Sequence, residues 1–229
     1  MPNTNFSDIA SAKTLVLADM MAVKMQQSPN SILVVGCGDG NEAGILARYY
    51  KGSRTIGIDV GVQFKFDHEA SAPATLIEMD AHQLDFDSGT FDLVYSFHAL
   101  EHMANPSKAL SEMARVLAPQ GTFCVGTPNK SRLVGYIGST TTFSTKIYWN
   151  MVDLKNRICG RWDNATGAHA GFFSTELLSM CRTAFGCGED VSENYYKRLY
   201  PKSRIIKAAV SSPLKHLIMP CCYVIGVAH

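Results

Sequence analysis

Residues 31–40 read SILVVGCGDG, an apolar run that leads directly into three glycines spaced two residues apart. The run at 31–35 does not alternate polar and apolar residues, which is typical of a strand buried on both faces of a parallel sheet. Residues 41–50 then have the pattern of a helix. Glycines between a buried strand and a helix let the backbone approach a ligand closely, because no Cβ stands in the way. The stretch therefore predicts the first, ligand-binding strand of an α/β sheet.

Further strands and helices are predicted to alternate downstream of this loop. A helix after residue 104 has Asn105 as N-cap and Pro106 in its first turn, both favoured at these positions. Another helix is expected at 174–185, capped by Ser174 or Thr175. The alternation predicts a doubly wound α/β fold with a mostly parallel, seven-stranded sheet. The six other predicted strands are 55–60, 75–79, 91–96, 121–127, 189–198 and 220–228.

Length and composition are those of one globular domain, with 229 residues of which 46% are hydrophobic and 18% charged. The longest stretch near the C-terminus without a charged residue or His is 217–228, shorter than the ~20 residues of a membrane-spanning helix. Seven scattered cysteines and the lack of a basic leader indicate a cytoplasmic protein. We expect a single domain over 1–229, built from a leading helix (1–30), a cofactor-binding core (31–128), an inserted cap (129–171) and a C-terminal helix with strands (172–229).

Charge is distributed unevenly along the chain. Residues 1–128 hold 8 Lys and Arg against 14 Asp and Glu, a net −6, whereas residues 129–229 hold 13 against 6, a net +7. The two halves can simply attract each other across the fold, or the second half can face an anionic partner. The segment 202–216 is basic and amphipathic. It is therefore either a solvated face or a surface that binds an anionic or membrane-proximal substrate.

The glycine loop and two acids predict a nucleoside site. A dinucleotide fingerprint would place its third glycine at position 41, but Asn41 stands there, which argues against a pyrophosphate ligand. Asp59 ends the second predicted strand, where a carboxylate accepts hydrogen bonds from ribose hydroxyls. Asp80, followed by Ala81, ends the third strand and is either an acceptor for an adenine amine or an ordinary strand-end cap.

Several motifs together resemble the class I S-adenosylmethionine-dependent methyltransferases, in particular the small-molecule branch with its quinone and natural-product O-methyltransferases. The motifs lie within residues 31–128: VVGCGDG at 34–40, GIDV at 57–60, DA at 80–81, LDF at 84–86, FDLV at 91–94, LEH at 100–102 and LSEMARVLAPQG at 110–121. The resemblance implies a Rossmann-like fold and S-adenosylmethionine as cofactor. It also implies cofactor contacts from Gly36, Gly38, Asp39, Gly40, Asp59, Val60, Asp80, Ala81, Phe97 and His102.

The sequence can also be compared with the motifs of two other activities, those of zinc proteases and of nucleic-acid methyltransferases. HALEH at 98–102 fits the zinc-protease pattern H-x-x-E-H, but no third ligand is apparent, so we predict no metal and no zinc. Amine methylation of nucleic acid would favour Asn/Asp-Pro-Pro-aromatic where Ser96-Phe97-His98-Ala99 stands, and a cytosine C5 enzyme needs a Cys after Pro there. The pair Pro220-Cys221 lies far away in sequence. Both patterns argue against nucleic acid as the substrate, although the basic second half leaves RNA open.

A hydroxyl group that accepts a methyl group needs a base to remove its proton, and His suits this role at neutral pH. His98, at the end of the fourth predicted strand, and His169, in the loop before the 174–185 helix, are the candidates. The acceptor is expected to be a small or lipid-linked molecule such as a phenol or a sugar. If the acceptor atom were nitrogen or a carbanion, no base would be required. A non-catalytic protein that binds cofactor or a partner on this fold is the other alternative.

Overall fold

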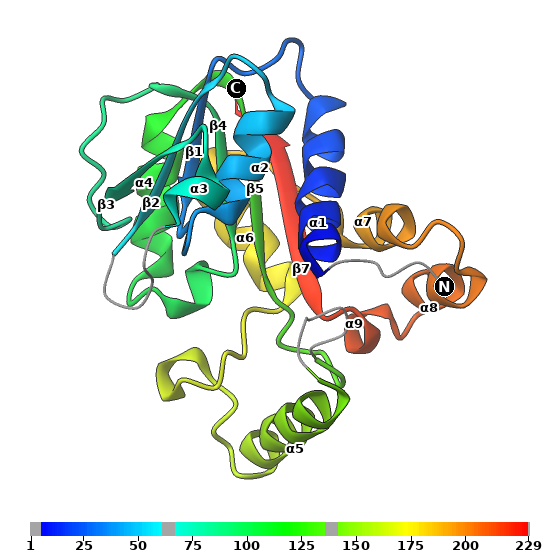
Figure 1. The fold of residues 1–229 in the computed structure, drawn as a ribbon. Coiled ribbons are helices and arrows are strands. Elements are labelled where there is room, and N and C mark those ends of the chain that lie inside the picture. The colour runs from blue at the N-terminus through cyan, green and yellow to red at the C-terminus, as the bar shows by residue number, and fades with distance from the viewer. Residues whose placement is uncertain (1–5, 61–66, 136–141, 229) are drawn as a thin grey trace.

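The structure is a computed structural model that describes residues 6–60, 67–135 and 142–228. These residues form one seven-stranded sheet in the order β3-β2-β1-β4-β5-β7-β6 (Figure 1). β7 runs antiparallel to both of its neighbours, and the other pairs are parallel. The predicted doubly wound sheet is therefore confirmed. Its strands are β1 Ser31–Val35, β2 Arg54–Asp59, β3 Thr75–Glu78, β4 Phe91–Phe97, β5 Leu117–Pro128, β6 Glu189–Asp190 and β7 Cys221–Val227.

Helices cover both faces of the sheet (Figure 1). α4 and α6 bury their apolar side chains against one face, and α1, α2 and α7 bury theirs against the other. In β1, Leu33 and Val35 contact the first layer while Ile32 and Val34 contact the second, which explains the unbroken apolar run. The described helices are α1 Phe6–Ala22, α2 Asn41–Tyr49, α3 His68–Ser71, α4 Pro106–Val116, α5 Phe143–Ile158, α6 Ser174–Phe185, α7 Ser192–Leu199, α8 Arg204–Val210 and α9 Lys215–Ile218, with short 3-10 turns η1 Leu100–His102 and η2 Asn164–Thr166.

A partly buried ion pair fastens the loop after β3 to α4. The Glu112 carboxylate accepts from Arg115 at 2.8 Å and from the backbone N–H of Leu84 at 3.0 Å. Arg115 also donates to the carbonyls of Leu84 and Phe86, each at 2.8 Å. The Arg115 guanidinium lowers the pKa of Glu112 to about 2. The loop that begins at residue 81 is thereby held against the sheet.

The cap is helical in part and lies beyond the carboxyl end of β5 (Figure 1). α5, with 16 residues, is its longest described helix, and the portion at 136–141 lies outside the described residues. Asn129, where the cap begins, donates its side-chain amide to the carbonyls of His216 and Met219 at 2.6 and 2.8 Å. The base of the cap is therefore tied to α9. No helix in the described ranges is long and apolar enough to cross a membrane.

The prediction of a strand over 189–198 was wrong beyond its first two residues. β6 is only Glu189–Asp190, and Ser192–Leu199 forms α7. The Asp190 carboxylate accepts from the N–H and the hydroxyl of Ser192 at 2.9 and 2.6 Å, which starts the helix. Tyr195 and Tyr196 of α7 pack against Tyr223 of β7.

Two element ends also differ from the predictions. The N-cap of α6 is Phe173, not Ser174 or Thr175, and the Phe173 N–H donates to the Glu176 side chain at 3.3 Å. The fifth strand begins at Leu117 instead of Gly121, because Leu117 pairs with Phe91 of β4. The other predicted strands, and the helices expected at 41–50 and 174–185, agree with the observed elements to within one or two residues, and α1 lies within the leading segment 1–30.

Candidate active site

The glycine loop follows β1, and two features can require glycine in it: a positive φ, and a neighbouring atom too close for a Cβ. Gly36 has φ +71°, and a Cβ there would lie 2.1 Å from the Cβ of Ala99. Gly38 has φ +56°, but a Cβ there would meet no atom within 4 Å. Gly40, at φ +93°, is the N-cap of α2. Packing against the segment after β4 therefore demands Gly36, whereas Gly38 borders open space at the surface of the loop.

Asp59, at the end of β2, is anchored to this loop. Its carboxylate accepts from the Gly38 N–H and the Val60 N–H, both at 2.8 Å. Each carboxylate oxygen has a second lone pair for a further donor. Asp39 accepts from the N–H of Asn41 at 3.0 Å and so steadies the start of α2. Asp59 thus lies beside the open side of the glycine loop.

Asp80 follows β3 with its side chain exposed, next to the buried Ala81. Its carboxylate accepts from the backbone N–H of His82 at 2.9 Å and pairs with His82 Nδ1 at 2.6 Å. The N–H of Asn105 donates to His82 Nε2 at 3.1 Å, so Nδ1 carries the proton. The hydrogen bonds from His82 lower the pKa of Asp80. Sequence reasoning missed His82, although Asp-x-His is a recognisable turn pattern.

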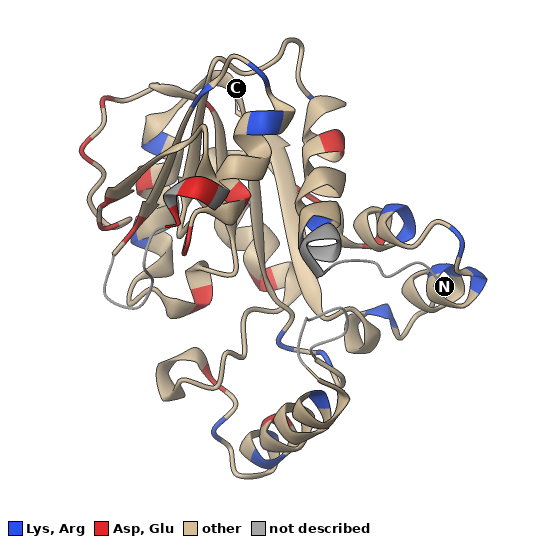
Figure 2. Cartoon of the chain, in the orientation of Figure 1, with Lys and Arg blue, Asp and Glu red and all other residues tan. Residues whose placement is uncertain are grey.

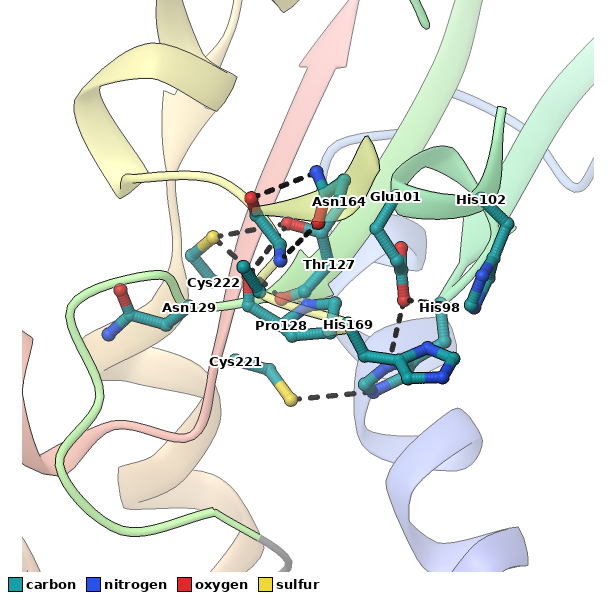
Figure 3. A network of polar contacts seen from close by, with 12 residues as sticks. His98, Glu101, His102, Thr127, Pro128, Asn129, Asn164, His169, Cys221 and Cys222 are labelled. Carbon is teal, nitrogen blue, oxygen red and sulfur yellow. Dashed lines mark hydrogen bonds and ion pairs between the residues drawn. The ribbon is translucent and has the colours of Figure 1, made fainter. Parts of the chain in front are cut away.

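Two histidines and a glutamate gather after β4 (Figure 3). His98 Nδ1 lies 3.4 Å from Glu101 Oε1, and His102 Nε2 lies 3.9 Å from the same oxygen. The Glu101 side chain is only 2% exposed, whereas the two histidines reach solvent. The Phe97 ring packs edge-on against the His98 ring at 4.0 Å. The carboxyl end of β4 therefore carries a titratable cluster on a buried carboxylate.

His169 joins this cluster from the cap. Its ring lies 4.7 Å from the ring of His102, centroid to centroid. The buried Arg132 donates to the carbonyls of His169 and Ala170, at 3.2 and 3.0 Å, and pairs with Asp153 of α5 at 3.4 Å. The structure thus brings together the two histidines proposed as bases, which are distant in sequence, and Arg132 holds the loop that carries one of them.

The two candidate bases differ in charge. Burial, and then the neighbouring His102, lower the pKa of His169, so its imidazole is neutral at pH 7. Burial opposes the charged form of His98 as well, but the Cys221 sulfur and the Glu101 carboxylate outweigh it and raise the pKa of His98 to about 10. His98 is therefore protonated at pH 7, and of the two only His169 is ready to accept a proton.

Cys221 is a site neighbour that the sequence did not suggest. Its Sγ lies 3.4 Å from His98 Nε2 (Figure 3). The Pro220-Cys221 pair is far from β4 in sequence, but the antiparallel β7 begins at the edge of the sheet where β4 and β5 end. The described residues contain no group of three or more His, Cys, Asp or Glu placed to hold a metal ion. The absence of zinc stays a prediction.

Comparisons with known proteins agree with this geometry. Residues 33–125 match the family described as the methyltransferase domain. An uncharacterized methyltransferase of Mycobacterium tuberculosis is 30% identical over 138 residues, 58% of this chain and 66% of that protein. The chloroplastic tocopherol O-methyltransferase of Arabidopsis thaliana is 31% identical over 122 residues, 50% of this chain and 35% of that protein. The chain covers less than two thirds of the length of both relatives.

A solved structure shows the same fold. The plantazolicin methyltransferase, in complex with a desmethyl analogue and S-adenosylhomocysteine, has a TM-score of 0.65 at 13% identity and covers 99% of this chain and 86% of that chain. The sheet order, the glycine loop and the match over residues 33–125 are those of a class I S-adenosylmethionine-dependent methyltransferase domain.

The residues present fit this cofactor. Open space borders Gly38, whose N–H donates to the Asp59 carboxylate. This anchored carboxylate can still accept hydrogen bonds from hydroxyl groups. Asp80 offers an exposed carboxylate that His82 orients. Val60 is half exposed beside Asp59, so an apolar surface adjoins the polar one. An adenosine with a neighbouring cationic group matches this combination of acids, glycine backbone and apolar surface.

Proposed function

We propose that this chain transfers the methyl group of S-adenosylmethionine to a hydroxyl oxygen of a small-molecule acceptor. The observation that carries the proposal is the meeting of His169 with His102 and His98 at the carboxyl end of β4, on the edge where the glycine loop also lies. A neutral histidine beside the cofactor site suits an acceptor that must lose a proton. The tocopherol O-methyltransferase among the relatives adds support for oxygen as the acceptor atom.

The cofactor, when bound, supplies a methyl carbon that is electrophilic because its sulfur is positively charged. In our proposal the backbone of Gly36, Gly38 and Gly40 borders its amino-acid part, and Asp39 steadies that loop. Asp59 and Val60 hold the ribose side. Asp80 and Ala81 hold the adenine, while Phe97 and His102 form the wall toward the acceptor. Much of the acceleration would come from fixing donor and acceptor in line.

His169 is the proposed base, and it accepts the proton of the acceptor hydroxyl. Its lowered pKa keeps it unprotonated at neutral pH. The protonated His98 is suited to orient the acceptor or to stabilise a developing negative charge on it. This division narrows the two bases expected from the sequence to one. Arg132 serves as a positioning residue, because its guanidinium holds the backbone of the His169 loop.

We propose further that the acceptor is presented at an anionic membrane surface, as a lipid-linked molecule would be. The basic segment 202–216 supplies part of the contact. Ile206 and Val210 pack toward the core, while Ile205 and Leu214 are exposed beside exposed Lys202, Arg204 and Lys207. Figure 2 shows Lys and Arg concentrated on the side of α5 and α7–α9.

α5 offers a further surface of this kind, because its apolar side is turned outward. Its inner side is polar: Asn150 bonds to Gly135, Asp153 to Arg132, and Arg157 to the carbonyl of Lys130. A stripe of apolar side chains at positions 143, 147, 151, 154 and 158 is 46% to 78% exposed. This spacing puts all five on one face of a helix. An apolar face flanked by basic residues fits the interface of an anionic membrane.

Calorimetry tests the cofactor part. We expect S-adenosylhomocysteine to bind and NAD not to bind. Asp59→Ala should weaken S-adenosylhomocysteine binding at least tenfold, about 1.4 kcal/mol. The matched control is Asp85→Ala, which removes an exposed carboxylate from the loop after β3. Tight NAD binding without a response to S-adenosylhomocysteine would overturn the proposal.

Isotopically labelled cofactor tests the reaction. The protein is incubated with extracts, phenols, glycosides, lipid-linked sugars and RNA, and the labelled product is identified by mass spectrometry. We expect label on a hydroxyl oxygen, and His169→Asn should lower the turnover at least tenfold. Label on nitrogen, or an unaffected His169→Asn variant, would remove the base. Label in RNA would favour the RNA alternative, and bound cofactor with no transfer to any class would favour a non-catalytic binding protein.

A further inference from the structure

Cys221, His98 and Glu101 lie in the order nucleophile, base and orienting acid (Figure 3). Cys221 Sγ is 3.4 Å from His98 Nε2, and His98 Nδ1 is 3.4 Å from Glu101 Oε1. The two ring nitrogens of one imidazole therefore face the sulfur on one side and the carboxylate on the other. This arrangement activates thiols in enzymes, because the ring can take the thiol proton while the acid stabilises the resulting cation. Methyl transfer as proposed above uses no thiol.

The carboxylate of Glu101 is placed to hold a positive imidazole. Its side chain is 2% exposed, and among the described residues its Oε2 has no hydrogen-bond partner. A buried carboxylate is costly unless a cation lies near, and the two closest cation-forming groups are His98 and His102. Glu101 thus favours the charged form of His98, which in turn favours a negative sulfur.

The backbone also holds the pair in position. His98 has φ +53°, an unusual value for a residue with a side chain, and its N–H donates to the carbonyl of Gly126 at 2.9 Å. The N–H of Cys221 donates to the hydroxyl of Tyr196 at 3.0 Å. The His98 side chain is 41% exposed and Cys221 is half buried, so a small reagent can reach the sulfur.

Several other charged or titratable groups interact with Cys221 and His98. Burial raises the pKa of Cys221, but His98, and more weakly Arg132 and Lys13, lower it further than burial raises it. Glu101 acts on His98. Glu42, of α2, interacts electrostatically with His98. His102 Nε2 lies 3.9 Å from Glu101 Oε1, and the His169 ring packs against the His102 ring.

We propose that Cys221 is an activated thiolate, paired with the imidazolium of His98 and supported by Glu101, that adds to electron-poor carbons of conjugated carbonyl compounds. The thiolate forms a C–S bond to the β-carbon, and the π electrons move to the carbonyl oxygen. The enolate then takes the proton from His98 Nε2. The products are a neutral thioether and a neutral imidazole, and nothing is oxidised or reduced.

N-ethylmaleimide, itself a conjugated carbonyl compound, tests this directly. Peptide mass spectrometry follows the alkylation of each cysteine separately, from about pH 5.5 to 8.5. Exposed Cys159, on the cap, is the internal control. We expect its rate to rise about tenfold per pH unit, as for an ordinary thiol, while the rate of Cys221 changes less than about twofold. At the acid end Cys221 should react about tenfold faster than Cys159, since a larger thiolate fraction outweighs its lower nucleophilicity.

Variants then assign the effect. His98→Asn should give Cys221 the pH dependence of Cys159, and Glu101→Gln should shift its profile part of the way. The unchanged rate of Cys159 and an unchanged circular dichroism spectrum show that a variant is folded. A wild-type Cys221 that follows the slope of Cys159, or reacts more slowly than it at every pH, overturns the proposal without any variant. Cofactor binding and methyl transfer are measured separately, so that outcome leaves the proposed function standing.

Discussion

The cofactor-binding core and the cap are stabilised in opposite ways. In the core, residues 31–128, apolar side chains of the strands and of α4 point into two buried layers. In the cap, residues 129–171, α5 turns polar side chains inward and an apolar stripe outward. Hydrophobic burial therefore holds the cofactor side in place, and directional polar contacts hold the side that faces the proposed acceptor. The exposed apolar face of the cap is the surface that we propose contacts an anionic membrane.

Charge follows the same division. The acidic side chains near the cofactor site, such as Asp59 and Asp80, lie along β2 and β3, whereas Lys and Arg are concentrated on α5 and α7–α9 (Figure 2). The net charges of −6 over 1–128 and +7 over 129–229 thus reflect two surfaces. In the proposed function the acids act locally, on neutral donors of the adenosine. The basic side offers a long-range attraction for an anionic surface.

The largest effect is expected in the glycine loop. Gly36→Ala puts a Cβ 2.1 Å from that of Ala99 at a φ of +71°. We expect the free energy of unfolding, measured with urea, to fall by about 3 kcal/mol or more. Gly38→Ala is the matched control, because it has positive φ but open space, and should cost only about 1 kcal/mol. Equal losses in the two variants would mean that packing against Ala99 is not what requires Gly36.

The next effect separates the cap from the core. Arg132→Ala removes the ion pair with Asp153 and the donors to the carbonyls of His169 and Ala170. We expect amide exchange in 168–171 to accelerate roughly 100-fold, about 2.7 kcal/mol of local opening. Exchange in β1 should stay unchanged. If β1 accelerates equally, the cap and the core unfold as one unit and the contrast between them is wrong.

A pH-dependent effect of about 2 kcal/mol is expected for Glu112→Gln at neutral pH, because charged hydrogen bonds to Arg115 are lost. Folding lowers the pKa of Glu112 from 4.5 to about 2. Its stabilisation is therefore complete above the unfolded value and disappears as the pH falls toward 2. Urea unfolding of both proteins between these limits should show the difference shrinking. A difference that is constant with pH would contradict this origin.

The smallest effect on stability is expected at the outer stripe of α5. Leu154→Glu should change the free energy of unfolding by less than about 0.5 kcal/mol, because the side chain is exposed. Flotation with anionic vesicles should nevertheless weaken at least tenfold, since an apolar contact of this size contributes about 1.5–3 kcal/mol when buried. Asn156→Glu makes a similar charge change on the opposite side of the same helix and should float nearly as the wild type does.

Flotation with vesicles also tests the basic segment 202–216. The triple variant Lys202→Glu/Arg204→Glu/Lys207→Glu should lose binding to anionic vesicles, and high salt should weaken the wild type in the same way. Binding to neutral vesicles should be weaker throughout. If the wild-type protein binds no vesicle, or the triple variant methylates the identified acceptor at the wild-type rate, the segment is only a solvated face. A second copy of this chain covering α5 would appear instead as a dimer in ultracentrifugation.

Much of the fold was predictable because its signals are local. The unbroken apolar run at 31–35, the N-cap Asn105 and the glycine loop each depend on neighbours within one strand or turn. Asp59 was also predictable, since a strand end beside such a loop is its only requirement. The strand predicted over 189–198 failed beyond residue 190 for the converse reason: Tyr195 and Tyr196 suit a strand locally, but the hydrogen bonds from Ser192 to Asp190 and packing on Tyr223 favour a helix.

The sequence by itself determined the alternating core, the sheet class and the positions of Asp59 and Asp80 at the ends of β2 and β3, because periodicity and glycine positions act over a few residues. Only the tertiary structure decided which side chains gather around His98 and His169. His98 and Cys221 are 123 residues apart, and Arg132 and His169 are 37 apart. Their contacts depend on the antiparallel return of β7 and on a cap held by polar bonds. No local pattern encodes which distant side chains such a return brings within hydrogen-bonding distance.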